Sequence, residues 1–184
     1  MTVLSDVDIA RELGYGDLDV SPVDLEEQLQ PNSLDIRLGE DISFINSKNE
    51  FIDSKQSLDD QIYEMDFSGD SFKLYPDDFA LASTVESFNI PDYLYAELNG
   101  RSSIARLGIE IHSTGGVIDS GFNGDIVLEM SNNLCHPVKL YPGMRIAQVI
   151  FYRMESRANN PYSEKDNKYQ NQEGVVHSRI NEEL

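Results

Sequence analysis

The chain of 184 residues has the length of one domain, and 40% of its residues are apolar, enough to close a core. Its 33 acidic and 14 basic residues give a net charge of −19, which disfavours binding to nucleic acid or anionic membranes. No stretch approaches the roughly 20 apolar residues that span a bilayer, and the N-terminus lacks the features of a signal peptide. We therefore expect one cytoplasmic domain over residues 1–184 that binds neither nucleic acid nor membrane.

The acidic residues are spread along the whole chain, a pattern that suits solubility in a salt-rich, halophile-like cytoplasm because salt screens self-repulsion. The alternative is a merely acidic mesophilic protein. The lone Cys135 excludes an internal disulfide.

The first third of the chain predicts two short helices and a strand. Ser5 followed by Asp8 is a capping box that predicts a helix ending at Gly14. Ser21-Pro22 predicts a second helical turn that ends before Pro31. From Ser33 to Gly39 apolar and polar residues alternate, which is typical of a half-buried strand.

The rest of the chain predicts a mainly β fold. Residues 46–73 are polar and weakly periodic, so we expect an irregular excursion or a wide hairpin. Short β-like runs separated by turn residues follow at Phe79–Thr84, Tyr95–Leu98, Gly108–His112, Asp125–Met130, Pro137–Leu140 and Ile146–Tyr152. Many short strands and few long helices indicate a barrel or jelly roll with short helices. A polar, Asn-rich tail occupies about residues 160–184.

The segment from Gly100 to Gly108 is the richest in groups that bind anions. Ser102 and Ser103 stand at the start of a short helix-like stretch, where hydroxyls can cap free N–H groups and form an anion site. Arg101 and Arg106 flank them, and arginine suits bidentate contact with phosphate. The segment indicates a bound phosphate; the alternative is a capped surface turn whose arginines pair with nearby acids.

The segment from Thr114 to Gly124 contains four glycines, which permit tight turns and close approach of the backbone to a ligand. Asp119 lies between Ile118 and a further glycine turn. Its carboxylate can accept a hydrogen bond from a sugar hydroxyl or cap the turn, and the pattern leaves both open.

Residues 125–130 predict a strand with Ile126, Leu128 and Met130 on one face and Val127 and Glu129 on the other. A glutamate at such a position lies either on a solvated face, the more frequent case, or in a pocket. In a pocket it can serve as a proton shuttle.

The histidines are His112, expected in a strand, His136, expected in a loop, and His177 in the tail. The His-x-Glu and Pro-Cys-x-x-Cys pattern of zinc deaminases does not occur, and neither does a P-loop. We expect no zinc and no metal ligands from protein side chains.

Taken in order, these segments resemble the dCTP deaminase family of the dUTPase-like superfamily. The matching stretches are Leu4–Asp6, Gln30–Gly39, Gly100–Gly108, Ile118–Gly124, Ile126–Glu129, Tyr141–Gln148 and Pro161–Arg179. The resemblance implies a dUTPase-like distorted β-barrel or jelly roll with a C-terminal lid. It also implies a homotrimer with active sites between subunits, and magnesium that travels with the triphosphate.

The resemblance further implies hydrolytic deamination of dCTP to dUTP, with Glu129 as the general base and acid that activates a water. Ser103 and Arg106 would place this water and the pyrimidine, while Arg101 and Ser102 would reach the phosphates. Asp119 would bind the 3′-hydroxyl. Further contacts with the nucleotide would come from Ile104, Ala105, Val127, Leu128 and Gln148, and from Tyr162, Lys168 and Gln172 in the lid.

The product remains a separate question. Thr114–Asp119 lacks the His-Arg pair seen before Ile-Asp in typical dUTP-releasing bacterial enzymes, and it resembles the Thr-Ala-Gly-x-Ile-Asp form of the dUMP-forming group. The departure is Gly115 in place of Ala. We therefore expect hydrolysis of dUTP to dUMP and pyrophosphate in the same site. The alternatives are a deaminase that releases dUTP, a plain dUTPase and a non-catalytic nucleotide sensor.

Overall fold

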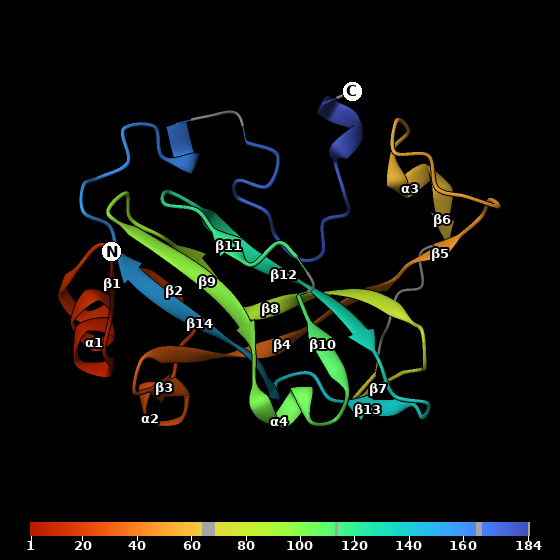
Figure 1. Cartoon of the computed structure of the whole chain (residues 1–184), viewed down its shortest axis with the longest axis horizontal. Coiled ribbons are helices and arrows are strands. Elements are labelled where there is room, and N and C mark those ends of the chain that lie inside the picture. The colour runs from red at the N-terminus through yellow and green to blue at the C-terminus, as the bar shows by residue number, and fades with distance from the viewer. Residues whose placement is uncertain (64–68, 113, 165–166, 184) are drawn as a thin grey trace.

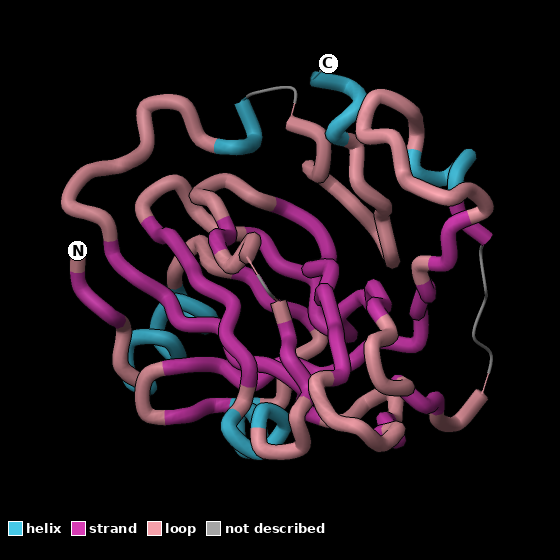
Figure 2. The backbone as a smooth tube through the Cα atoms, turned by 45° about the vertical axis from the view of Figure 1, so that its right-hand side comes forward, coloured by secondary structure: helices cyan, strands magenta, loops and turns pink. Residues whose placement is uncertain are grey.

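The structure is a computed structural model that describes residues 1–63, 69–112, 114–164 and 167–183. Its centre is a curled, ten-stranded antiparallel sheet, with short helices around the edge of the molecule (Figures 1 and 2). The main path of the sheet runs β10-β12-β8-β4-β14-β9-β11, while β1, β2 and β3 pair with β14, β8 and β4. The mainly β fold predicted from the sequence is confirmed.

The strands of this sheet are β1 (Thr2–Val3), β2 (Asp19–Ser21), β3 (Leu29–Gln30), β4 (Ser33–Phe44), β8 (Phe79–Asn89), β9 (Leu94–Gly100), β10 (Ile109–Ile111), β11 (Val117–Ile118), β12 (Asn123–Asn132) and β14 (Arg145–Arg153). Two small sheets pair β5 (Asn46–Ser47) with β6 (Ile62–Tyr63), and β7 (Phe72–Leu74) with β13 (Val138–Leu140). The helices are α1 (Asp6–Tyr15), α2 (Leu25–Gln28), α3 (Leu58–Gln61), α4 (Ser102–Ala105), η1 (Tyr162–Glu164) and η2 (Ile180–Glu183).

The N-terminal helix forms as its capping box predicts. Ser5 is the N-cap of α1, and its hydroxyl accepts a hydrogen bond from the N–H of Asp8 at 3.3 Å. Ile9 is fully buried. The helix runs past Gly14 to Tyr15, and its C-cap is Gly16.

Two expectations in the first third of the chain are wrong in their bounds. Ser21 ends β2 rather than opening a helix, and α2 begins only at Leu25 because Asp24 supplies the cap, accepting from the N–H of Glu26 at 3.0 Å. The strand predicted to end at Gly39 continues to Phe44. It is buried on both faces at its start because its polar side chains, such as Asp35, find polar partners inside the protein.

The polar region 46–73 contains the small hairpin of β5 and β6, although residues 64–68 of that region lie outside the described part. The core packs around large side chains that are almost completely buried, including Phe88, Phe151, Leu34 and Leu128. Within the described ranges, no helix is long and apolar enough to cross a membrane.

The C-terminal tail returns across the molecule to the start of β12 (Figure 1). The N–H of Asn171 donates to the carbonyl of Asn123 at 2.7 Å, and the N–H of Asp125 donates to the carbonyl of Gln172 at 3.0 Å. Gln172 also forms an isolated parallel bridge with Gly124. The tail is therefore held by main-chain hydrogen bonds, and side chains add to them, since Nε2 of Gln172 also donates to the carbonyl of Asp125 at 2.6 Å.

Candidate active site

A cavity of about 690 Å³ opens between β12, the glycine-rich residues that follow β10, and the C-terminal tail. Its polar lining includes Glu129, Asp119, His112 and Gln172, and its apolar lining includes Val127 and Ile118. This size suits a small ligand, and the few polar groups are the kind that orient one.

Glu129 reaches the cavity because β12 alternates as the sequence predicts. Leu128 and Met130 are fully buried on the core side of the strand, whereas Val127 and Glu129 are half-buried on the other side. The register of β12 against β8 shifts between Asp125 and Val127, an irregularity of the pairing that lies where the strand begins to line the cavity. Glu129 therefore lies in a pocket rather than on an open solvated face. Any contact of a ligand with Leu128 would have to be made by its main chain.

His112 lies beside Glu129 and is a functional candidate that the sequence did not reveal. It follows β10 instead of belonging to a strand, with a φ of 71°, which non-glycine residues rarely adopt. Both of its ring nitrogens are buried and make no hydrogen bond within the described part of the chain. No sequence pattern marks a residue of this kind, because the burial of its ring depends on how the folded chain packs around it.

Gly115 forms the wall of the cavity next to His112 and Glu129. A Cβ atom at this position would lie 3.4 Å from Cε1 of His112 and 3.8 Å from Oε1 of Glu129. The glycine therefore leaves a little more room beside the carboxylate than an alanine would.

Asp119 follows β11 and is exposed at the edge of the cavity. Its main-chain carbonyl accepts from the N–H of Phe122 at 3.1 Å, so the main chain closes this turn. Its carboxylate has no hydrogen-bond partner among the described residues and is available to a ligand.

The tail supplies the remaining wall of the cavity, as a lid would. Tyr162 packs on Phe122 with 6.0 Å between the ring centroids, and burial raises the pKa of Tyr162, with Asp119 as a lesser contributor. Its phenol therefore stays protonated at neutral pH. Lys168 lines a smaller adjoining cavity of about 450 Å³ with Tyr162 and pairs with Glu183.

The predicted anion-binding segment lies elsewhere in this chain. Its α4 helix is at the lower edge of the molecule in Figure 1, whereas the tail crosses the upper edge. None of residues 100–108 lines the cavity. The chain by itself therefore presents two half-sites, one with the carboxylates and the lid, and one with the serines and arginines.

The local structure of α4 leaves this second half-site open. Ser102, Ser103, Ala105 and Arg106 are exposed, while Ile104 is buried. The predicted capping by serine hydroxyls is wrong: the N-cap residue is Arg101, and no side chain caps the helix. Neither hydroxyl has a hydrogen-bond partner in the described part of the chain, so both are available to a ligand.

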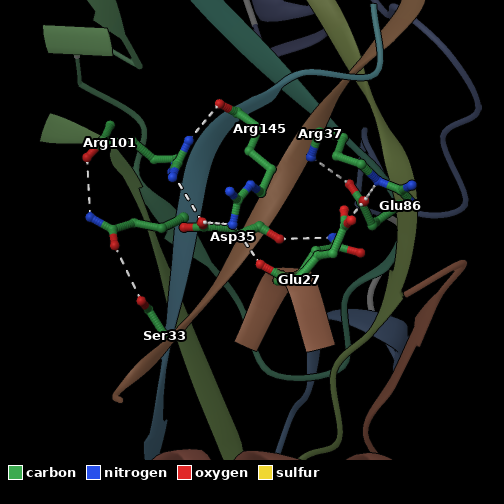
Figure 3. Close-up of polar contacts among 10 residues, drawn as sticks. Glu27, Ser33, Asp35, Arg37, Glu86, Arg101 and Arg145 are labelled. Carbon is green, nitrogen blue, oxygen red and sulfur yellow. Dashed lines mark hydrogen bonds and ion pairs between the residues drawn. The ribbon is translucent and has the colours of Figure 1, made fainter. Parts of the chain in front are cut away.

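The two arginines of this segment behave differently. Arg101 forms an ion pair with Asp35 at 3.1 Å (Figure 3). This pairing agrees with the alternative interpretation of the segment, a surface turn whose arginines pair with nearby acids. Arg106 makes no ion pair with any described residue. Burial raises the pKa of Asp35, and the charges of Arg101 and Arg145 oppose that rise.

Gln148 belongs to this second half-site rather than to the cavity. Its Nε2 donates to the carbonyl of Gly100 at 3.2 Å, and its Oε1 accepts from the hydroxyl of Ser33 at 3.1 Å (Figure 3). Gln148 therefore ties β14 to the residue that precedes Arg101.

A curled antiparallel sheet with a carboxylate-lined cavity, a tail along that cavity and a separate arginine segment defines a β-rich protein with a cavity of the size that suits a small ligand. The dCTP deaminase-like family model matches residues 3–154, and the chain belongs to this family. The family predicted from the sequence is confirmed.

The sequence similarity to known proteins covers almost the whole chain. A Dictyoglomus thermophilum protein named dCTP deaminase, dUMP-forming is 45% identical over 97% of this chain and 95% of its own length. A Halorubrum lacusprofundi protein named dCTP deaminase is 44% identical over 97% of this chain and 91% of its own length.

A solved structure agrees with the fold. The crystal structure of 2′-deoxycytidine 5′-triphosphate deaminase from Agrobacterium tumefaciens has a TM-score of 0.64 and 25% sequence identity. The similarity covers 82% of this chain and 47% of that chain, so the present chain spans about half the length of that protein.

Proposed function

We propose that this chain deaminates dCTP and hydrolyses the resulting dUTP to dUMP and pyrophosphate in the same site. The observation that carries this proposal is the placement of Glu129 in a cavity that the tail helps to enclose, on a strand whose alternate residues face the core. Membership in the dCTP deaminase-like family and relatives named dUMP-forming support the substrate and the product. Release of dUTP is the alternative product, and the relatives named dUMP-forming do not favour it.

Glu129 supplies the proton transfers. Its carboxylate takes a proton from a water whose oxygen attacks C4 of cytosine, and returns that proton to N3. A second transfer, from the new hydroxyl to the exocyclic amine, allows the C4–N4 bond to break and ammonia to leave. Asp119 lies at the edge of the cavity, and its carboxylate accepts a hydrogen bond from the 3′-hydroxyl of the deoxyribose.

The tail excludes water and contacts the nucleotide. Tyr162 and Gln172 line the cavity, and Lys168 lines the adjoining smaller one, where an ammonium group can meet phosphate oxygens. Magnesium arrives with the triphosphate. The described residues contain no group of three or more His, Cys, Asp or Glu side chains that could hold a metal ion.

The anion-binding half-site acts in the cavity of a neighbouring copy in a homotrimer. This arrangement accounts for the serines and arginines of α4 being exposed while none of them lines the cavity of its own chain. In the neighbouring cavity, Ser103 and Arg106 would place the attacking water and the pyrimidine, and Arg101 and Ser102 would take the phosphates. Closed rings of identical subunits bring two different surface patches together in this way.

Complementation between two inactive variants tests the shared site. Glu129→Gln disables the carboxylate half and Arg106→Ala disables the arginine half. If one site uses both halves from different subunits, random mixed trimers regain about one quarter of the wild-type sites. We expect ammonia release from dCTP to recover to about that level after the two variants are unfolded and refolded together. Failure to recover, with wild-type protein recovering fully after the same treatment, would place both halves within one subunit.

A further inference from the structure

Asp35, in the first half of β4, holds two arginine side chains on one carboxylate oxygen (Figure 3). The Nε atom of Arg101 is 3.1 Å from Oδ2 of Asp35, and the Nη1 atom of Arg145 is 3.3 Å from the same oxygen. The side chain of Asp35 is 3% exposed, whereas those of Arg101 and Arg145 are 24% and 39% exposed. A buried carboxylate thus fixes two guanidinium groups that reach the surface.

The protein uses only part of each guanidinium group. Arg101 also donates from Nη1 to the main-chain carbonyl of Arg145 at 2.9 Å, and Arg145 donates from Nη1 to the carbonyl of Glu27. Within the described ranges, no acceptor contacts Nη2 of Arg101, or Nε and Nη2 of Arg145. Each arginine therefore keeps N–H groups for a ligand while its remaining donors hold it in place.

The cluster of Asp35, Arg101 and Arg145 has more positive charge than a structural ion pair requires. One arginine would balance the buried carboxylate, and the second leaves a surplus of one positive charge. The nearby carboxylate of Glu86 does not neutralise that surplus, because Glu86 is already paired with Arg37, with Oε1 2.6 Å from Nε. In a chain of net charge −19, such a surplus indicates attraction of an anion.

The cluster adjoins the predicted phosphate segment. Arg101 is the N-cap of α4, next to the exposed hydroxyls of Ser102 and Ser103. The pairing of β14 with β9 places Ala147 opposite Gly100, which brings Arg145 to the edge where this segment begins. Arg145 therefore lies beside Arg101, the residue that precedes the two serines, although 44 residues separate the two arginines.

We propose that Arg145 is a second arginine that binds the triphosphate, and that Asp35 is a positioning residue that holds Arg101 and Arg145 as one phosphate fork. This inference rests on the proposed function, in which residues 101–106 receive the phosphates. Fixing both guanidinium groups before binding removes part of the entropy cost of ordering them on the ligand. Two forked donors side by side also match the oxygens of adjacent phosphates.

The direction in which Asp35→Asn changes the affinity for polyphosphate distinguishes a positioning role of Asp35 from simple charge balance. Asp35→Asn removes a negative charge and makes the cluster more positive. If Asp35 only balances charge, the variant binds polyphosphate more tightly. If Asp35 positions the arginines, the variant binds polyphosphate more weakly despite the added positive charge.

The experiment uses inorganic tripolyphosphate as a probe without a base, measured by calorimetry on the full chain, together with steady-state kinetics on dCTP. We expect Asp35→Asn to weaken tripolyphosphate binding about tenfold and to raise KM for dCTP by a similar factor, with kcat changed less than about threefold. Arg145→Lys, which keeps the charge but loses the fork, should have the same effect in both measurements. Glu86→Gln is the matched control, since it removes a buried carboxylate that pairs with Arg37 outside the phosphate segment.

Unchanged or tighter binding of tripolyphosphate by Asp35→Asn would overturn the positioning role. If Arg145→Lys binds tripolyphosphate as tightly as wild type, the phosphate-binding role of Arg145 is overturned. Because the side chain of Arg145 is 39% exposed, this variant tests the inference even if Asp35→Asn fails to fold. Wild-type protein that binds tripolyphosphate but releases no ammonia from dCTP would count against the proposed function and not against the arginine fork.

Discussion

The main-chain N–H of His112 donates a hydrogen bond to the main-chain carbonyl of Glu129, with 2.7 Å between nitrogen and oxygen. His112 directly follows β10 and has a positive φ. The hydrogen bond joins it to β12, the strand that bears the proposed catalytic carboxylate of Glu129. As a result, an imidazole with no hydrogen-bond partner among the described residues and a carboxylate lie on one wall of the cavity. The backbone, rather than a side-chain contact, fixes their relative position.

Glu129→Gln should lower kcat for deamination at least about a hundredfold, because an amide of the same shape cannot take a proton from water. Binding of dCTP, measured by calorimetry, should change little. Glu110→Gln, on the exposed face of the neighbouring strand β10, is the matched control and should behave as wild type. Substantial ammonia release by Glu129→Gln would remove this residue from the mechanism.

Gly124→Ala should displace the lid. A Cβ atom at Gly124 would lie 2.7 Å from the carbonyl oxygen of Gln172 and 2.9 Å from its nitrogen, and the φ of 134° disfavours any side chain. We expect KM for dCTP to rise about tenfold as the tail contact is lost. Gly143→Ala is the strain-matched control, since its φ is 82° but no atom lies within 4 Å of the new Cβ. Gly143→Ala should lower the melting temperature without raising KM, and an equal KM effect in both variants would refute the lid contact.

His177→Ala should loosen the far end of the lid. One ring nitrogen of His177 contacts the hydroxyl of Ser43 at 2.9 Å and the other contacts the carboxylate of Asp59, and its neighbours Val176 and Ser178 line the cavity. Loss of these bonds should raise KM for dCTP about fivefold, with little change in the thermal stability of the sheet. His136→Ala, an exposed histidine away from the lid, serves as the comparison. A wild-type KM for His177→Ala would show that this end of the tail does not hold the nucleotide.

Tyr95→Phe should reduce the loss of stability at alkaline pH. Burial, followed by the hydrogen bond to Glu97, raises the pKa of Tyr95 from 10.0 to about 12. Because the folded chain binds this proton more tightly than the unfolded chain, its contribution is complete below pH 10 and disappears as the pH approaches about 12. Urea unfolding at several pH values above 9 should show a shallower fall for Tyr95→Phe than for wild type. Tyr15→Phe, at a 94% exposed position, should follow wild type, and a Tyr95→Phe curve parallel to wild type would contradict the shift.

Local patterns predicted much of the fold because they depend on neighbouring residues. The capping residue Ser5 and the alternation along β12 follow from spacing within one element. The strand after Ser33 was predicted too short, since its polar residues are buried by partners that come from distant parts of the chain.

The candidate site was harder to predict from the sequence because it depends on pairing between distant parts of the chain. The pattern of β12 left open whether Glu129 is solvated or in a pocket, and the returning tail decides this. Asp35 and Arg145 lie 110 residues apart, and only the pairing of β14 with β4 brings them together. The separation of the carboxylate and arginine half-sites is likewise a property of the folded chain.

The most direct test of the central claim is a product analysis of the purified protein with dCTP and magnesium, without zinc. Nucleotides are resolved by anion-exchange chromatography, and ammonia is assayed in parallel. The account predicts ammonia, dUMP and pyrophosphate in equal amounts. Ammonia with dUTP as the only nucleotide product would contradict dUMP formation, and dUMP formed from added dUTP with no ammonia from dCTP would contradict the deaminase itself.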